Sequence, residues 1–101
     1  PTGFDYWNIL PEQGDYYNPN FINMDGSQTR ETGYVTNIVT DKAIDWMENK
    51  RDKSRPFILF IHHKACHRDW LPEMKYLRLY EDKTFPLPST FDDNYDGNQE
   101  Q

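Results

Sequence analysis

Apolar side chains recur at helical spacing in one stretch of the chain, residues 34–49. They fall at intervals of three and four residues, at Val35, Ile38, Val39, Ala43, Trp46 and Met47. This period predicts an amphipathic helix with one apolar face. Asn49, Lys50 and Arg51 follow, and they place positive charge at the end of the helix where its dipole favours cations.

A second pattern, an unbroken apolar run, occupies residues 57–61 within the segment PFILFIH. Continuous rather than alternating apolarity predicts a strand that is covered on both faces, as in a parallel sheet. The aromatic and β-branched segment at residues 3–9 predicts an earlier short strand. Two strands separated by a helix indicate α/β layering.

Turn-forming residues dominate two segments before the predicted helix. Residues 12–20 mix Gly, Asn, Asp and Pro with two tyrosines, and we expect an ordered loop there because Tyr16 and Tyr17 would be costly to leave unpacked. Residues 21–29 contain Asp25-Gly26 between two short extended runs. That pair supplies the positive φ angles of a tight turn, so it predicts a β-hairpin.

The last third of the chain carries weaker signals. Residues 72–80 predict a short helix with Pro72 in its first turn, where a missing N–H costs little, and with Met74 and Leu77 packed inward. Pro86, Pro88 and the polar residues that follow predict an extended tail over residues 89–101.

Composition indicates that the 101 residues do not form a self-sufficient core. Hydrophobic residues make up 36% of the chain and the mean hydropathy is -1.01, yet aromatics reach 16%. Because the chain also starts at Pro1 rather than Met, we expect residues 1–101 to be an internal segment of a longer protein that packs against the remainder. No apolar run approaches the roughly 20 residues that cross a bilayer.

Charge and cysteine content exclude further classes. The formal net charge of -6 argues against a nucleic-acid partner, because phosphate binding requires a basic surface. The single cysteine excludes an internal disulfide.

All three histidines lie within six positions, immediately after the predicted buried strand. They are His62, His63 and His67; Lys64 lies between them and Arg68 follows directly. Ligands of open α/β sheets bind outside the carboxyl ends of the strands, so this loop is the candidate site. A strand of seven residues spans about 23 Å at roughly 3.3 Å per residue. The other basic residues lie at its far end, where we expect a solvated linker: Lys50, Arg51, Lys53 and Arg55.

Several roles remain open for this cluster. His63 and His67 could form a metal pair, but the pairing needs a helix and the motif has no Glu after the first His. Cys66 could be a nucleophile, although no distant histidine remains to act as its base. The cluster could bind an anion through Lys and Arg while a histidine transfers a proton near neutral pH. The histidines could also simply end the strand and bond to backbone.

The segment PFILFIHHKACHRDWLPEMKYLRLYEDKTFPLP resembles the central segment of type I sulfatases of the alkaline phosphatase superfamily. In that family a strand leads into a His-Lys-x-Pro-His or His-x-Pro-His loop, followed by Trp, Pro and a short helix. The upstream stretches GYVTNIVTDKAIDWMENK and GFDYWNILPEQGDYYNP are similar to the preceding helix and segment, so the likeness covers about residues 3–88. It implies an α/β fold: part of a three-layer, alkaline-phosphatase-like sandwich with buried, mostly parallel strands, flanking helices and a small β-hairpin.

The resemblance also implies residue roles. His67 matches a catalytic histidine that contacts the sulfate ester and protonates the departing alcohol oxygen. Lys64, Arg68 and His63 would bind substrate or orient the loop. Cys66 stands where the family usually has proline, which removes a constraint on φ and leaves the direction of His67 less fixed.

The resemblance further implies what the 101 residues lack. The family's formylglycine arises in a Cys/Ser-x-Pro/Ala-x-Arg motif, which is absent here, and its calcium ligands lie in other segments. We therefore expect residues 1–101 alone to be inactive, with no metal ligands of their own. The intact, periplasmic or extracellular enzyme (lysosomal in an animal) would hydrolyse sulfate esters of sulfated carbohydrates, using calcium and formylglycine. The alternatives are a phosphodiesterase or phosphomutase of the same superfamily, or a non-catalytic carbohydrate-binding module that uses the tyrosines and tryptophans.

Overall fold

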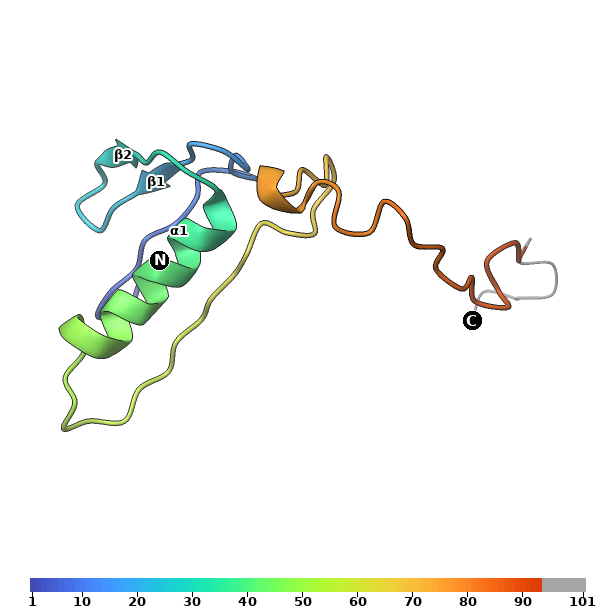
Figure 1. Ribbon diagram of the computed structural model, residues 1–101. Helices are drawn as coiled ribbons and strands as arrows, with labels where there is room; N and C mark the ends of the chain where they lie inside the picture. Colours follow the sequence, from blue (N-terminus) through green and yellow to red (C-terminus); the bar gives the residue numbers. More distant parts are fainter. Residues whose placement is uncertain (94–101) are drawn as a thin grey trace.

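The computed structural model of the chain describes residues 1–93 and is shown in Figure 1. A small hairpin and one helix pack together, and a long extended segment then runs back along the helix. The regular elements are β1 (Asn20–Ile22), β2 (Gln28–Arg30), α1 (Val35–Asp45), a π-helical turn (Trp46–Lys50) and a 3-10 turn (Met74–Tyr76). No helix among residues 1–93 has the length and apolar character needed to cross a membrane.

The β-hairpin predicted at residues 21–29 is confirmed. Strands β1 and β2 pair antiparallel across the turn that contains Asp25 and Gly26. Gly26 has a φ of 82°, a left-handed conformation that favours glycine. One carboxylate oxygen of Asp25 accepts hydrogen bonds from the Ser27 backbone N–H at 2.9 Å and from its hydroxyl at 2.6 Å. The side chain therefore closes the turn as an Asx-turn does.

The helix predicted over residues 34–49 is confirmed. Helix α1 begins at Val35, and the π-helical turn extends it to Lys50. Val35 and Ala43 are buried on its inner face, as the apolar period indicates. Lys50 pairs with Asp45 at 2.8 Å near the C-terminal end.

A small core lies between the hairpin, α1 and the loop that precedes β1. Its buried side chains are Tyr16, Pro19, Phe21, Val35 and Ala43. The loop is joined to the start of the helix by backbone bonds, among them that from the Val35 N–H to the Tyr16 carbonyl at 2.8 Å. The ordered loop expected around the two tyrosines is therefore confirmed.

The strand predicted at residues 3–9 is wrong except at its last residue. Ile9 alone forms a β-bridge, to Ile22, with N···O distances of 3.2 and 2.7 Å. The preceding residues do not pair with a strand. Tyr6 lies near the end of the helix, where the Lys50 ammonium nitrogen is 5.7 Å from the centre of its ring. Aromatic content raises β propensity, but a strand also requires a partner for its backbone.

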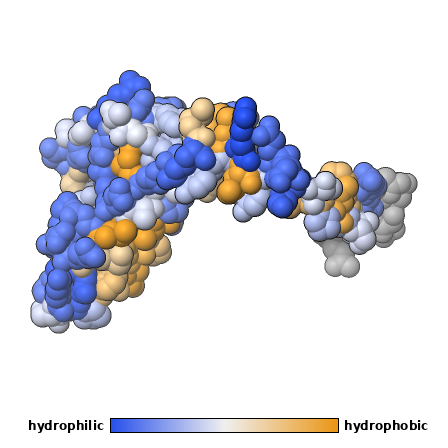
Figure 2. Space-filling model, viewed as in Figure 1, coloured by the Kyte–Doolittle hydropathy of each residue, from blue (hydrophilic) through white to orange (hydrophobic). Residues whose placement is uncertain are grey.

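The strand predicted within residues 56–62 is also wrong. Residues 57–61, here called the apolar strap, are extended, but no backbone hydrogen bond joins them to another segment of residues 1–93. On one face of this extended segment Ile58 is 79% exposed and Phe60 63% exposed, and on the other Phe57 is 47% exposed and Ile61 41% exposed. Neither face is therefore covered as a buried strand requires. Figure 2 shows apolar atoms on the surface beside α1, where the strap runs. Phe57 rests against Trp46, with 5.6 Å between ring centroids.

The three-layer sandwich with mostly parallel strands is likewise contradicted. In the part of the chain that the structure describes, the one sheet is the antiparallel pair β1–β2. The radius of gyration is 19.1 Å, whereas a compact domain of about 100 residues has roughly 13 Å. The physical reason is that a parallel sheet needs neighbouring strands and covering helices on both faces, and residues 1–93 provide a single long helix.

The C-terminal third is open. The helix predicted at residues 72–80 is reduced to the 3-10 turn Met74–Tyr76. Met74 and Leu77 are 68% and 58% exposed instead of packed inward. The tail predicted at residues 89–101 begins with a turn, in which the Phe91 N–H donates to the Pro88 carbonyl at 3.0 Å. Residues 94–101 of that predicted tail lie outside the described residues.

Candidate functional site

The histidine loop, residues 62–72, leaves the end of the apolar strap and folds back over the loop at residues 12–20, which carries Tyr16 and Tyr17. Two turns shape it: the His67 N–H donates to the Lys64 carbonyl at 2.9 Å, and the Trp70 N–H donates to the His67 carbonyl at 3.2 Å. Asp69 and Trp70 have φ angles of 80° and 41°. These left-handed conformations are uncommon for residues other than glycine, and they reverse the chain directly after Arg68.

The structure brings four of the five candidate side chains to one cleft. His62, His63, Lys64 and His67 line it, whereas Arg68 is exposed and is not among the lining residues. The His67 imidazole is exposed, and its Nδ1 lies 3.4 Å from the Arg68 carbonyl, a long contact. His67 is thus accessible for chemistry, while His62 contacts Phe60, with 6.0 Å between ring centroids.

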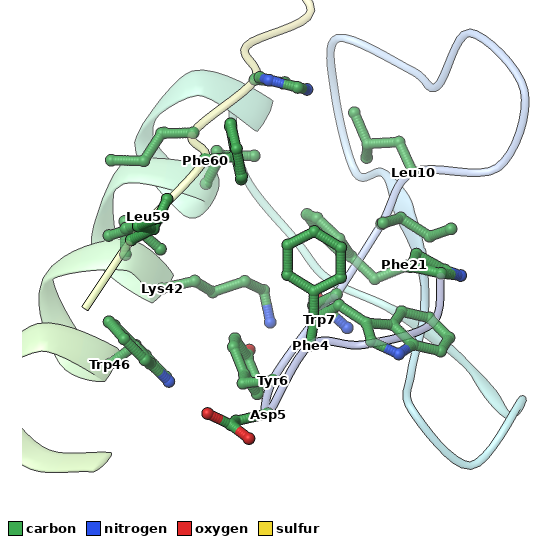
Figure 3. A pocket seen from close by; sticks show the side chains of 18 of the residues that line it. Phe4, Asp5, Tyr6, Trp7, Leu10, Phe21, Lys42, Trp46, Leu59 and Phe60 are labelled. Atoms are coloured by element: carbon green, nitrogen blue, oxygen red, sulfur yellow. The ribbon is translucent and has the colours of Figure 1, made fainter. Parts of the chain in front are cut away.

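The cleft is open and has a volume of about 1190 Å³. Figure 3 shows that the N-terminal segment forms one wall, and that α1 and the apolar strap form the other. Aromatic rings are prominent among its lining side chains, with Phe4, Trp7, Trp46 and Phe60 labelled in the view. Phe4 and Phe60 approach edge to face at 6.1 Å between ring centroids. The histidines therefore border a largely apolar concavity.

Lys64 is tethered as well as positioned at the cleft. Its ammonium nitrogen donates a hydrogen bond to the Gln13 carbonyl at 2.9 Å. The same nitrogen lies 4.9 Å from the centre of the Tyr16 ring, within cation–π range. An ammonium group has three donors, so Lys64 retains capacity for an anionic ligand.

Three tyrosine hydroxyls hold the histidine loop by its backbone, a feature that sequence reasoning missed. Each donates to a different carbonyl: Tyr16 to His67 at 2.6 Å, Tyr17 to Pro72 at 2.6 Å and Tyr34 to Leu71 at 2.8 Å. The available signal was the Tyr16-Tyr17 pair in a turn-rich segment, because a packed tyrosine needs a partner for its hydroxyl. The identity of that partner, about 50 residues away, could not be read from the sequence.

The three rings also pack on one another. Tyr34 lies between the other two, with ring centroids 6.3 Å from Tyr16 and 5.2 Å from Tyr17. Burial is the main cause that raises the pKa of Tyr16 above 10.0, and Tyr34, Cys66 and Asp69 raise it further by charge. The Tyr16 hydroxyl is therefore protonated at neutral pH and remains a donor to the His67 carbonyl.

The structure bears on the other chemistries considered for this loop. Among residues 1–93, no three side chains of His, Cys, Asp or Glu are grouped as a metal site. Cys66 is exposed and has no disulfide partner. His63 and His67 do not share a helix face, because the loop that carries them has no helical turn. The geometry leaves His67 as an exposed histidine whose backbone N–H and carbonyl are both held by hydrogen bonds.

Comparison with known proteins identifies relatives over nearly the whole chain. No family model matches. An N-acetylglucosamine-6-O-sulfatase of Bacteroides thetaiotaomicron is 48% identical over 100 residues, which cover 96% of this chain and 18% of the relative. The N-acetylglucosamine-6-sulfatases of goat and human are 24% and 23% identical over 96 residues, or 90% of this chain.

A solved structure matches the fold described above. It shows another protein, 47% identical to this chain, in complex with that other protein's substrate, D-glucosamine-2-N,6-O-disulfate. The TM-score is 0.87, and the match covers 98% of this chain and 20% of that one. The chain thus spans about a fifth of the length of the relatives that it matches. Along almost its entire length, the chain is homologous to one segment of these sulfatases.

Proposed function

We propose that the complete protein carrying these residues hydrolyses the 6-O-sulfate ester of a glucosamine-type sugar, and that the histidine loop forms one wall of its sulfate-ester site. The observation that carries the proposal is the match, at a TM-score of 0.87, to a protein solved with a doubly sulfated glucosamine. The 48% identical relative, named for the same class of ester, supports it. The phosphodiesterase and phosphomutase alternatives have no such support.

The assigned step is proton delivery by His67. Hydrolysis breaks the bond between sulfur and the sugar oxygen, and that oxygen must gain a proton to leave as an alcohol. A primary alcohol is a poor leaving group, so a positioned acid accelerates the step by about 10²–10⁴-fold. The His67 imidazole can carry and donate a proton, and it lies exposed at the cleft, which suits it to this role.

The basic neighbours of His67 have a different role. Lys64 and His63 line the same cleft and would favour the negative charge of the sulfate group. Arg68 follows His67 directly and is exposed, so it would meet charge further out on a sulfated sugar. The apolar and aromatic walls would exclude water and pack against the sugar ring.

The calcium ion and formylglycine that the sulfatase family implies do not fit residues 1–93. These residues hold no group of three metal-ligating side chains, and Cys66 is followed by His67 and Arg68 rather than by the modification motif. Their ligands and precursor would have to come from other parts of the complete protein.

The test is His67→Ala in the complete protein, assayed on a 6-sulfated glucosamine and on nitrophenyl sulfate. We expect kcat to fall by about 10²–10⁴-fold on the sugar and much less on the aryl ester, whose leaving group needs little protonation. The matched control is Cys66→Ala, which should keep its kcat because the thiol has no part in the step. Unchanged turnover of both substrates by His67→Ala would overturn the assignment, and loss of activity in Cys66→Ala would restore the nucleophile hypothesis.

A further inference from the structure

We propose that Tyr16, Tyr17 and Tyr34 form a tyrosine clamp that positions His67 for proton delivery. The inference rests on the proposed function, because it names what holds the proton donor of that same site. The three are positioning residues, since their hydroxyls touch the histidine loop through its backbone. Their contribution to turnover therefore passes through the imidazole of His67.

The clamp acts on both sides of the chain reversal. The Tyr16 hydroxyl binds the carbonyl of His67 itself at 2.6 Å, in the peptide group next to the imidazole. The hydroxyls of Tyr34 and Tyr17 bind the carbonyls of Leu71 and Pro72, which follow the reversal. The loop is fixed at its functional residue and again four and five residues later.

The tyrosines of the clamp are anchored in the core, whereas the histidine loop that they bind is mostly exposed. Tyr16 is 5% exposed and Val35 is completely buried, and a backbone bond of 2.8 Å joins them. Tyr17 and Tyr34 form a β-bridge, and their rings are in contact. The histidine loop has no regular secondary structure of its own, and most of its residues are exposed. The hydrogen bonds from the three tyrosines therefore fix the position of the histidine loop.

The backbone is strained between His67 and Leu71, the two places where the tyrosines hold the loop, and this strain explains why a clamp is needed. Asp69 and Trp70 both adopt positive φ angles and both carry a Cβ. Such conformations persist only where the surrounding structure over-determines them. The three bound carbonyls enclose these two residues on either side. Without the hydroxyls, the reversal would relax and His67 would lose its fixed position.

The first experiment removes hydroxyls and keeps the rings, in the complete protein. Small displacements of a catalytic group lower rates steeply, by about 10²-fold for 1 Å. We expect Tyr16→Phe to lower kcat on a 6-sulfated glucosamine by about 3- to 10-fold, and Tyr16→Phe with Tyr34→Phe by about 10²-fold. KM should change little, and nitrophenyl sulfate should be turned over almost normally. The control is Tyr80→Phe, since the exposed Tyr80 contacts Phe85 and its hydroxyl makes no hydrogen bond within residues 1–93.

The second experiment repeats Tyr16→Phe in a His67→Ala background. A clamp that acts through His67 predicts no further loss there, because its target is gone. An equal, additive loss in that background, or a loss in the parent that matches Tyr80→Phe, would overturn the clamp while the proposed function stands. A His67→Ala variant with unchanged activity on the sugar would instead overturn both. Normal activity of Tyr16→Phe on the aryl ester separates mispositioning from unfolding.

Discussion

The ammonium nitrogen of Lys64 lies 4.9 Å above the centre of the Tyr16 ring, and the Tyr16 hydroxyl in turn binds the His67 carbonyl. One buried ring is thus shared by a basic residue and by the backbone of the proposed proton donor. Lys64 also binds the Gln13 carbonyl, so it ties the histidine loop to the N-terminal third of the chain. A residue that the sequence predicts as a substrate ligand therefore has a structural contact as well.

Replacement of Lys64 by methionine tests which of these roles dominates. The change keeps an unbranched apolar stem and removes the charge. We expect KM for a 6-sulfated glucosamine to rise about 10-fold, equivalent to about 1.4 kcal/mol, with kcat reduced by less than 3-fold. Steady-state kinetics on the complete protein measure the split. The control is Lys53→Met in the exposed linker, and an unchanged KM in Lys64→Met would leave this lysine with the tether alone.

Two glycines with similar φ angles give a matched pair of stability predictions. A Cβ at Gly14 would lie 2.8 Å from Cδ1 of Leu10, whereas a Cβ at Gly26 would meet nothing within 4 Å. Their φ angles are +63° and +82°. Gly26→Ala should therefore cost only the conformational strain, about 1–2 kcal/mol, and Gly14→Ala distinctly more. Thermal unfolding of the two variants checks this order, and equal shifts would show that Leu10 moves aside freely.

The hydrogen bonds of the Asp25 turn predict that the pKa of the Asp25 carboxyl depends on Ser27. Hydrogen bonds from the Ser27 side chain, and then from its backbone, hold the pKa of Asp25 below 3.8. Because the folded pKa is depressed, the stabilisation is present above the unfolded value of about 3.9 and is lost as the pH falls through the folded pKa. Ser27→Ala should raise the Asp25 pKa toward 3.8, as followed by NMR titration of labelled aspartates.

The same titration contains its own control. Asp52 accepts equivalent hydrogen bonds from Ser54 at 2.9 and 2.6 Å, and its pKa is lowered for the same reason. Ser27→Ala should leave the Asp52 pKa unchanged. An Asp25 pKa that stays low in Ser27→Ala would assign the shift to the backbone bond.

The apolar strap predicts the behaviour of residues 1–101 in isolation. Exposed runs of apolar, β-prone residues without charge favour intermolecular association. Ile58→Lys with Phe60→Lys should lower the light scattering of the isolated chain at a given concentration. Thr29→Lys with Thr32→Lys changes the net charge equally at exposed sites outside the strap and serves as the control. Equal scattering by both variants would attribute association to net charge.

Local patterns in the sequence were sufficient for the local elements. The period from Val35 to Met47 predicted α1, and Asp25-Gly26 predicted the hairpin, because both signals lie within a few consecutive residues. The apolar strap was predicted wrongly, because apolar content describes a preference for burial and supplies no partner strand. The helix expected after Pro72 shrank to one 3-10 turn for a related reason: its apolar side chains have no surface among residues 1–93 against which to pack.

In the candidate site too, the features encoded by neighbouring residues were predicted and the long-range contacts were not. The histidine cluster was visible because its members lie within seven consecutive residues, and the structure brings most of them to one cleft. Their roles as ligand and proton donor remain predictions. The tyrosine contacts bridge 37 to 55 positions in the chain, and no local period encodes such a pairing.

The distance along the chain between the tyrosines and the histidine loop has a consequence for engineering. A graft of residues 62–72 from one sulfatase into another would bring the imidazole without the hydroxyls that orient it. Chimeras should be active only when the acceptor carries tyrosines at positions 16, 17 and 34, because the hydroxyls bind backbone carbonyls of the loop. Compatibility between distant segments, rather than the loop's own residues, then limits which specificities can be exchanged.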